Sequence, residues 1–142
     1  MKNIFIALFI VLFSTILWSQ DSNGIQTKVL SKSVVSWDGK NLPNYKPGTP
    51  EITILKITIP PGAQLPIHKH PVINAGVLLR GELTVVTEEK DTLHLKAGES
   101  LIEVVNTWHY GKNEGRITAE ILVFYAGTQD APITIKKEDQ TK

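Results

Sequence analysis

Residues 62–82 read GAQLPIHKHPVINAGVLLRGE, and the rest of the chain is arranged around this segment. His68 and His70 stand at its centre, one residue apart and shortly after a Pro-Pro-Gly turn sequence. Because residues i and i+2 of an extended strand point to the same face, the two imidazoles can reach one point. Neutral imidazole is a common ligand of transition metals, so the pair can chelate a metal ion if the strand forms. A third imidazole has to come from elsewhere in the chain, and His109 is the candidate.

The N-terminus carries an apolar run, Ile4–Trp18, after a short segment with one positive charge. This run is shorter than the roughly 20 residues that a membrane-spanning helix needs. We interpret residues 1–19 as a signal peptide that is cleaved after Ser19, which predicts a secreted or periplasmic protein with no stable membrane association after cleavage. An uncleaved N-terminal anchor is the alternative, because Leu17 is a poor residue for the cleavage site.

The composition limits the classes of partner. The chain contains no cysteine, so neither a disulfide nor a lipoprotein-type lipid anchor can form. Its 15 Lys and Arg residues nearly balance its 14 Asp and Glu residues. A basic surface for nucleic acid or for anionic membranes is therefore not expected. The length that remains after the signal is typical of one domain, which must be held together by its apolar core.

The rest of the chain has the pattern of an all-β protein. Short runs rich in β-branched and aromatic residues alternate with Gly, Pro, Asn and Asp, and no helical period is sustained over a dozen residues. This pattern favours a sandwich, barrel or jelly roll. We predict an N-terminal strand and extended arm over residues 20–50, a barrel over residues 51–136 and a tail over residues 137–142. The predicted strands are Thr27–Trp37, Glu51–Pro60, Ala75–Arg80, Leu83–Glu88, Thr92–Leu95, Leu101–Val105, Thr107–Gly111, Ile117–Tyr125 and Ile133–Ile135.

Two sequence motifs resemble those of the cupin superfamily. The first motif has the pattern G-x5-H-x-H-x3-E-x6-G, and the second has the pattern G-x5-P-x-G-x2-H-x3-N. The matching residues are Gly62, His68, His70 and Gly81 in the first motif and Gly98, His109 and Asn113 in the second. Three positions depart from the patterns: Asn74 replaces Glu in the first, and Val104 and Asn106 replace Pro and Gly in the second.

The resemblance implies a double-stranded β-helix, the jelly-roll barrel of cupins, with a divalent metal ion inside. Cupins with the full pattern use three histidines and the Glu as ligands, so His68, His70, His109 and Asn74 are the expected ligands here. Fe²⁺ or Mn²⁺ is the expected ion, with Zn²⁺ or Ni²⁺ as alternatives. An amide oxygen lacks the charge that favours a hard dication. Three interpretations of Asn74 are therefore open. It is a weak fourth ligand, or it orients water or substrate beside a three-histidine centre like that of thiol dioxygenases. In the third, the pocket holds no metal and Asn74 is part of its lining.

Two acidic residues, Glu103 and Glu120, can replace the missing carboxylate as ligand or general base. A charged residue on the solvent-facing side of a half-buried strand is the commoner explanation for both. Parity also places His94 outside. Trp37 and Tyr125 are candidates for the lining of the pocket mouth, although a structural role as core aromatics is the commoner explanation. We expect Asn113 to be a capping or turn residue.

The function that the resemblance implies is a metal-dependent enzyme acting on a small oxygen- or thiol-bearing molecule, either a dioxygenase-like oxidoreductase or an isomerase. The alternative is a non-catalytic cupin that binds or senses a small molecule, with or without metal. Single-domain cupins often pair through their sheets, so we expect a homodimer to which the Asp38–Pro50 arm contributes.

Overall fold

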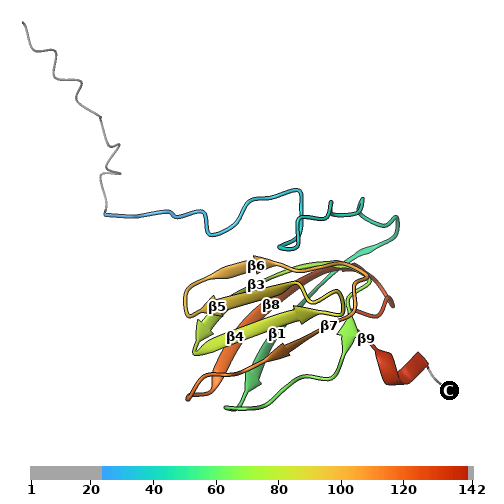
Figure 1. The fold of residues 1–142 in the computed structure, drawn as a ribbon. Coiled ribbons are helices and arrows are strands. Elements are labelled where there is room, and N and C mark those ends of the chain that lie inside the picture. The colour runs from blue at the N-terminus through green and yellow to red at the C-terminus, as the bar shows by residue number, and fades with distance from the viewer. Residues whose placement is uncertain (1–23, 141–142) are drawn as a thin grey trace, which may run out of the picture.

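The computed structural model describes residues 24–140, which are almost entirely β-strand and connecting loop (Figure 1). The strands of this part are β1 Pro50–Ile59, β2 His68–Lys69, β3 Ile73–Arg80, β4 Glu82–Thr87, β5 Thr92–Lys96, β6 Ser100–Ile102, β7 His109–Lys112, β8 Ala119–Thr128 and β9 Ile135–Lys136. A short 3₁₀ helix, Lys137–Gln140, follows β9. The predicted signal peptide, residues 1–19, lies outside the described residues. Within the described range, no helix has the length and apolarity to cross a membrane.

The strands form two antiparallel sheets. One sheet has the order β1-β8-β3-β6, and the other has the order β5-β4-β7-β2-β9 (Figure 1). The long pairing of β1 with β8 aligns Pro50 with Thr128 and Ile59 with Ala119. The predicted all-β class is therefore confirmed.

The core lies between the two sheets and follows from the two-residue period of the strands. In β1, Ile57 and Ile59 point inward, whereas Ile52 and Ile54 on the other face are 63% and 54% exposed. The opposite sheet supplies mainly Leu and Val side chains. The buried core includes Ile59, Val72, Leu78, Leu83, Val85, Leu95, Leu101, Ile121, Val123 and Tyr125.

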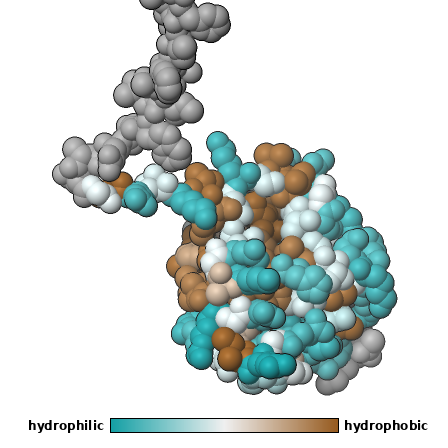
Figure 2. Space-filling model, turned by 60° about the vertical axis from the view of Figure 1, so that its left-hand side comes forward, coloured by the Kyte–Doolittle hydropathy of each residue, from teal (hydrophilic) through white to brown (hydrophobic). Residues whose placement is uncertain are grey.

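The predicted strand Thr27–Trp37 is wrong, because within this segment the structure has only an isolated bridge between Val35 and Asn41. The valines that suggested a strand stay in solvent: Val29 is 75% exposed and Val34 is 79% exposed. The segment runs instead as an arm along the barrel, and Figure 2 shows apolar patches on the side of the barrel that the arm approaches. The arm is fixed where the Trp37 backbone N–H donates to the carbonyl of Ile102.

The turns behave as the motifs predict. Gly81 has φ of 76°, and a Cβ there would lie 2.9 Å from the backbone of Thr118 and Ala119, so this tight connection from β3 to β4 requires glycine. Asn106 takes the left-handed conformation with φ of 57° at a position where the cupin pattern has Gly. Asn tolerates that conformation better than most residues, which explains why the turn survives the substitution.

Candidate metal centre

The three predicted histidines converge inside the barrel. His68 of β2 lies directly opposite His109 of β7 in the antiparallel pairing, and their ring centroids are 4.5 Å apart. His70 follows β2, and its ring centroid lies 4.9 Å from that of His68 and 5.1 Å from that of His109. One nitrogen from each ring can be chosen so that all three lie within 4.8 Å of one another. The prediction that these imidazoles meet at one point is confirmed.

Hydrogen bonds to backbone carbonyls fix the tautomer of all three rings. Each ring contacts a backbone carbonyl through its Nδ1 atom. His68 contacts the carbonyl of Pro66 at 2.7 Å, His70 that of Ile133 at 2.8 Å, and His109 that of Thr107 at 2.8 Å. A carbonyl oxygen only accepts, so each Nδ1 carries the proton and donates it. Each Nε2 then has a free lone pair, and this is the arrangement in which histidine binds a metal.

Burial keeps two of these rings, those of His68 and His70, uncharged. The pKa of His70 falls to about 3, mainly because burial removes the solvent that would stabilise an imidazolium; a proton on His109 or His68 would repel a second one. The pKa of His68 is also lowered, mainly by burial, and repulsion by a proton on His109 adds to the effect. At neutral pH the rings of His68 and His70 therefore offer lone pairs rather than protons.

The rings face a small cavity of about 50 Å³ with a mostly apolar wall. Its lining is Ile57, Ile59, Leu65, His68, His70, Asn74, Leu83, Val85, Glu103, His109, Gly111, Ile121, Val123 and Tyr125. A second hollow of about 170 Å³ shares His68, His70 and Tyr125 with the first and adds Thr134 and Lys136. This second hollow forms the mouth of the site, and Lys136 places a cationic side chain there.

Asn74, which replaces the motif Glu, lies in the cavity wall as its position in the motif predicts. It is 3% exposed, and its Nδ2 atom has no hydrogen-bond partner. A buried amide that is not hydrogen-bonded costs free energy, so such groups in proteins usually face a ligand or water. Through this NH₂ group Asn74 can donate to a molecule bound beside the histidines.

The expectation that Glu103 faces solvent is wrong. Glu103 is only 8% exposed, and its Oε2 atom lies 3.9 Å from the Nε2 atom of His109. The Trp37 indole N–H donates to the other oxygen, Oε1, at 2.8 Å, and thereby holds the carboxylate under the arm. Glu103 follows the buried core residue Leu101 by two positions, so the two-residue period of the strand also turns it inward.

The other candidates lie where they were expected. Glu120 forms an ion pair with Lys56 at 2.7 Å on the outer face of β8, and His94 is exposed. Tyr125 is a buried core aromatic whose ring packs edge-on to His70. Burial raises the pKa of the Tyr125 hydroxyl to about 12, and the Glu103 carboxylate contributes to the shift.

Asn113 is the expected structural residue. It is fully buried, and its Nδ2 donates to the carbonyls of Ile59 and Ile117, both at 2.8 Å. Its Oδ1 accepts from the Gly115 backbone N–H at 2.9 Å. The second motif therefore ends in a residue that ties the β7–β8 turn to the end of β1.

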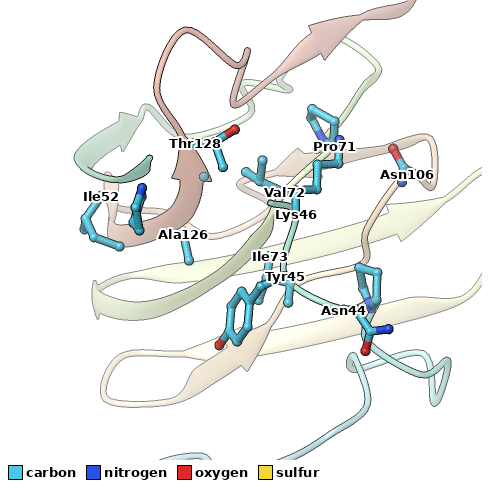
Figure 3. A pocket seen from close by; sticks show the side chains of 13 residues that line it. Asn44, Tyr45, Lys46, Ile52, Pro71, Val72, Ile73, Asn106, Ala126 and Thr128 are labelled. Atoms are coloured by element: carbon cyan, nitrogen blue, oxygen red, sulfur yellow. The ribbon is translucent and has the colours of Figure 1, made fainter. Parts of the chain in front are cut away.

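A larger hollow of about 410 Å³ lies elsewhere (Figure 3). It is lined by the arm around Tyr45 and Lys46, by residues of β1, β3 and β8, and by Pro71, Val72 and Asn106. None of the three histidines lines it. The chemistry that the sequence predicts therefore belongs to the smaller cavity.

The donor set fits a divalent cation. Metal–nitrogen and metal–oxygen bonds are about 2.0–2.2 Å long, so two ligands of one ion lie at most about 4.4 Å apart. Three ligands of one ion cannot all be opposite one another and instead lie about 3–3.5 Å apart, so the imidazole nitrogens, all within 4.8 Å, need to approach by roughly 1–2 Å at most. Side-chain rotation supplies such a movement, and the neutral rings of His68 and His70 need not lose a proton first.

Comparisons with known proteins agree with this architecture. A search of curated proteins found no match. Among solved structures, an oxalate oxidase in complex with the substrate analogue glycolate is 21% identical, with a TM-score of 0.53 over 61% of this chain and 46% of that one. DMSP lyase DddQ from Ruegeria pomeroyi is 18% identical, with a TM-score of 0.55 over 64% and 45%. Bacillus subtilis oxalate decarboxylase, which has Mn(II) centres, is 21% identical, with a TM-score of 0.54 over 63% and 24%.

This chain spans less than half the length of those three proteins, and similarity at such identities shows the shared double-stranded β-helix alone. The family model of the cupin domain matches residues 55–125, which is half of the 142-residue chain. That range contains both motifs and all three converging histidines, and the chain therefore belongs to the cupin family.

Proposed function

We propose that His68, His70 and His109 hold one divalent cation, and that the protein is an exported enzyme that acts on a small oxygen-bearing molecule at this ion. Two observations carry the proposal: three Nδ1–H groups donate to backbone carbonyls, which leaves the Nε2 atoms available as ligands, and one nitrogen from each ring lies within 4.8 Å of the other two. Fe(II) and Mn(II) are the favoured ions, and the Mn(II) centres of the similar oxalate decarboxylase support this choice.

A bound cation would polarise substrate oxygens as a Lewis acid or, if redox-active, support reaction with dioxygen in a dioxygenase-like reaction. The protein's own residues select and orient the substrate. The cavity of about 50 Å³ accepts only a small group, and its apolar wall excludes bulk water. The unpartnered Asn74 amide donates to a substrate oxygen, and Lys136 at the mouth attracts an anionic group such as a carboxylate.

The test is turnover by purified protein loaded with Fe(II) or Mn(II). Small carboxylates, catechols, diketones and thiols are offered in turn, and oxygen consumption and product formation are followed. We expect turnover of at least one small substrate, and its loss in the Asn74→Ala variant if the amide orients that substrate. Metal-loaded protein that turns over none of these compounds would contradict the enzymatic proposal.

A non-catalytic binding function is the second candidate, and one observation favours it. Tyr125, beside the histidines, has a pKa of about 12 and therefore keeps its proton at neutral pH, so it is a poor general base. Saturable binding of a small carboxylate without turnover would favour this function.

Two further parts of the proposal concern the whole chain. We propose export on the basis of residues 1–19, and detection of the mature protein outside the cytoplasm, beginning near Gln20, tests it. We also propose a homodimer, because the outer face of the β1-β8-β3-β6 sheet exposes Ile52, Ile54 and Phe124. Light scattering of the purified protein measures its mass, and a monomer would contradict pairing.

A further inference from the structure

The carboxylate that the cupin pattern has at position 74 is present on the neighbouring strand. The β3–β6 pairing places Ala75 opposite Ile102, and one step further along this register Asn74 lies opposite Glu103. A backbone hydrogen bond of 3.1 Å from Glu103 N–H to the Asn74 carbonyl confirms that the register continues. Directly opposed residues in an antiparallel pair point to the same face, so both side chains enter the cavity.

The two oxygens of Glu103 have different surroundings. Oε1 accepts from the Trp37 indole N–H at 2.8 Å and from the Val104 backbone N–H at 3.0 Å. These two donors fix the plane of the carboxylate. Oε2 is turned toward His109 and lies 3.9 Å from its Nε2. That separation is too long for a charge-assisted hydrogen bond, which measures about 2.7–2.9 Å. It lies within the roughly 4.4 Å limit for two ligands of one ion.

The charge of Glu103 needs a partner. A carboxylate as deeply buried as this one is costly unless a cation compensates it. No Lys or Arg lines the small cavity, and its three histidines are the only side chains there that can become cationic. A divalent ion between Oε2 and the Nε2 atoms would supply the missing positive charge.

We infer that Glu103 is the acidic ligand of the three-histidine centre. The chain thereby restores a donor set of three histidines and one carboxylate, with the carboxylate directly after β6 instead of on β3. Trp37 acts through Glu103 as a positioning residue and couples the arm to the centre. The inference rests on the proposed metal binding and extends it to a residue outside the family's Glu position.

The first test is metal affinity, measured by competition of Mn²⁺ or Zn²⁺ with a chromogenic chelator on the full chain without its signal. The variants are Glu103→Gln, His70→Ala and, as a matched control, Glu120→Gln on the outer face. We expect Glu103→Gln to weaken binding about tenfold or more, and Glu120→Gln to leave it unchanged. One outcome would overturn this inference alone: the wild type binds metal, His70→Ala does not bind it, and Glu103→Gln binds it as tightly as the wild type. In that case the proposed function still stands. A wild type that binds no better than His70→Ala defeats the proposed function itself.

The second test separates a ligand from a merely structural residue. Gln at position 103 keeps an oxygen for the Trp37 and Val104 donors but removes the buried charge. We therefore expect the melting temperature of Glu103→Gln to equal or exceed that of the wild type without metal, and to fall below it with metal. An equal fall in both states would show that Glu103 serves only the packing of the arm.

A third test exchanges the carboxylate across the strands. The double variant Asn74→Glu/Glu103→Gln returns the carboxylate to the position of the cupin pattern, and we expect it to regain most of the affinity lost in Glu103→Gln. Trp37→Phe removes only the indole donor, so it should weaken metal binding less than Glu103→Gln does. Metal affinity that stays low in the double variant would contradict the carboxylate exchange. Metal affinity that is unchanged in Trp37→Phe would contradict the positioning role of Trp37.

Discussion

His68 and His109 lie directly opposite each other in the pairing of β2 with β7, although one belongs to the first motif and the other to the second. This pairing converts two separate sequence signals into one site. It also places the third imidazole, on His70, within 5.1 Å of His109 measured between ring centroids.

Acid should destabilise the metal-free protein through His70. The pKa of His70 is about 3 in the folded state, and an unperturbed histidine has a pKa of about 6.5. Between these values the unfolded chain binds a proton that the folded protein does not. Stability is therefore complete above about pH 6.5 and falls with decreasing pH, by up to roughly 1.4 kcal/mol per pH unit from this group.

Urea denaturation of metal-free protein between about pH 4 and pH 7 measures this slope. The His70→Ala variant should show a shallower slope than the wild type, because the group that takes up the proton on unfolding has been removed. Identical slopes would mean that His70 is not the neutral buried ring that the structure places there.

Asn113 should matter for stability rather than for metal binding. Its amide makes three hydrogen bonds from a fully buried position, and Asn113→Ala leaves the carbonyls of Ile59 and Ile117 without this donor. We expect a loss of about 1–3 kcal/mol in the free energy of unfolding. The exposed Asn44→Ala serves as a control and should change little. Equal stability of the two variants would contradict the structural role.

Lys136 should strengthen the binding of small anions at the mouth of the site. Calorimetric titration of metal-loaded protein with glycolate should show several-fold weaker binding in Lys136→Ala, because the cationic side chain lines the mouth. The neighbouring Lys137→Ala is the control, since Lys137 lies near the Trp108 ring instead. The difference should shrink at high salt, as expected for an exposed charge. Equal affinities would exclude Lys136 from ligand binding.

The sequence predicts the parts of this site that depend on local geometry. The i, i+2 spacing of His68 and His70 is sufficient to place two rings together, and the motif spacing adds His109. Glu103 was misassigned because a charged residue was expected to face solvent. Its parity with buried Leu101 turns it inward, and the long-range hydrogen bond from Trp37, which satisfies the buried carboxylate, is not visible in the sequence.

The same limit explains the arm. The valines at positions 29 and 34 have the local preference of a strand. A strand also needs a neighbour to accept its hydrogen bonds. Residues 27–37 meet one only near their end, in the bridge from Val35 to Asn41 and in the hydrogen bond from the Trp37 N–H to the Ile102 carbonyl. Where the chain offers both preference and partner, as in β1 and β8, the predicted and observed strands overlap over most of their length.

The central claim is that three imidazoles hold one cation, and the most direct measurement is the metal content of protein purified without chelators or a metal-affinity tag. Elemental analysis should find close to one equivalent of a transition metal in the wild type and little in the His109→Ala variant, with the outer-face Glu120→Gln variant retaining the wild-type amount. Equal metal content in the wild type and His109→Ala, or none in the wild type even after incubation with Fe(II), Mn(II) or Zn(II), would contradict the claim.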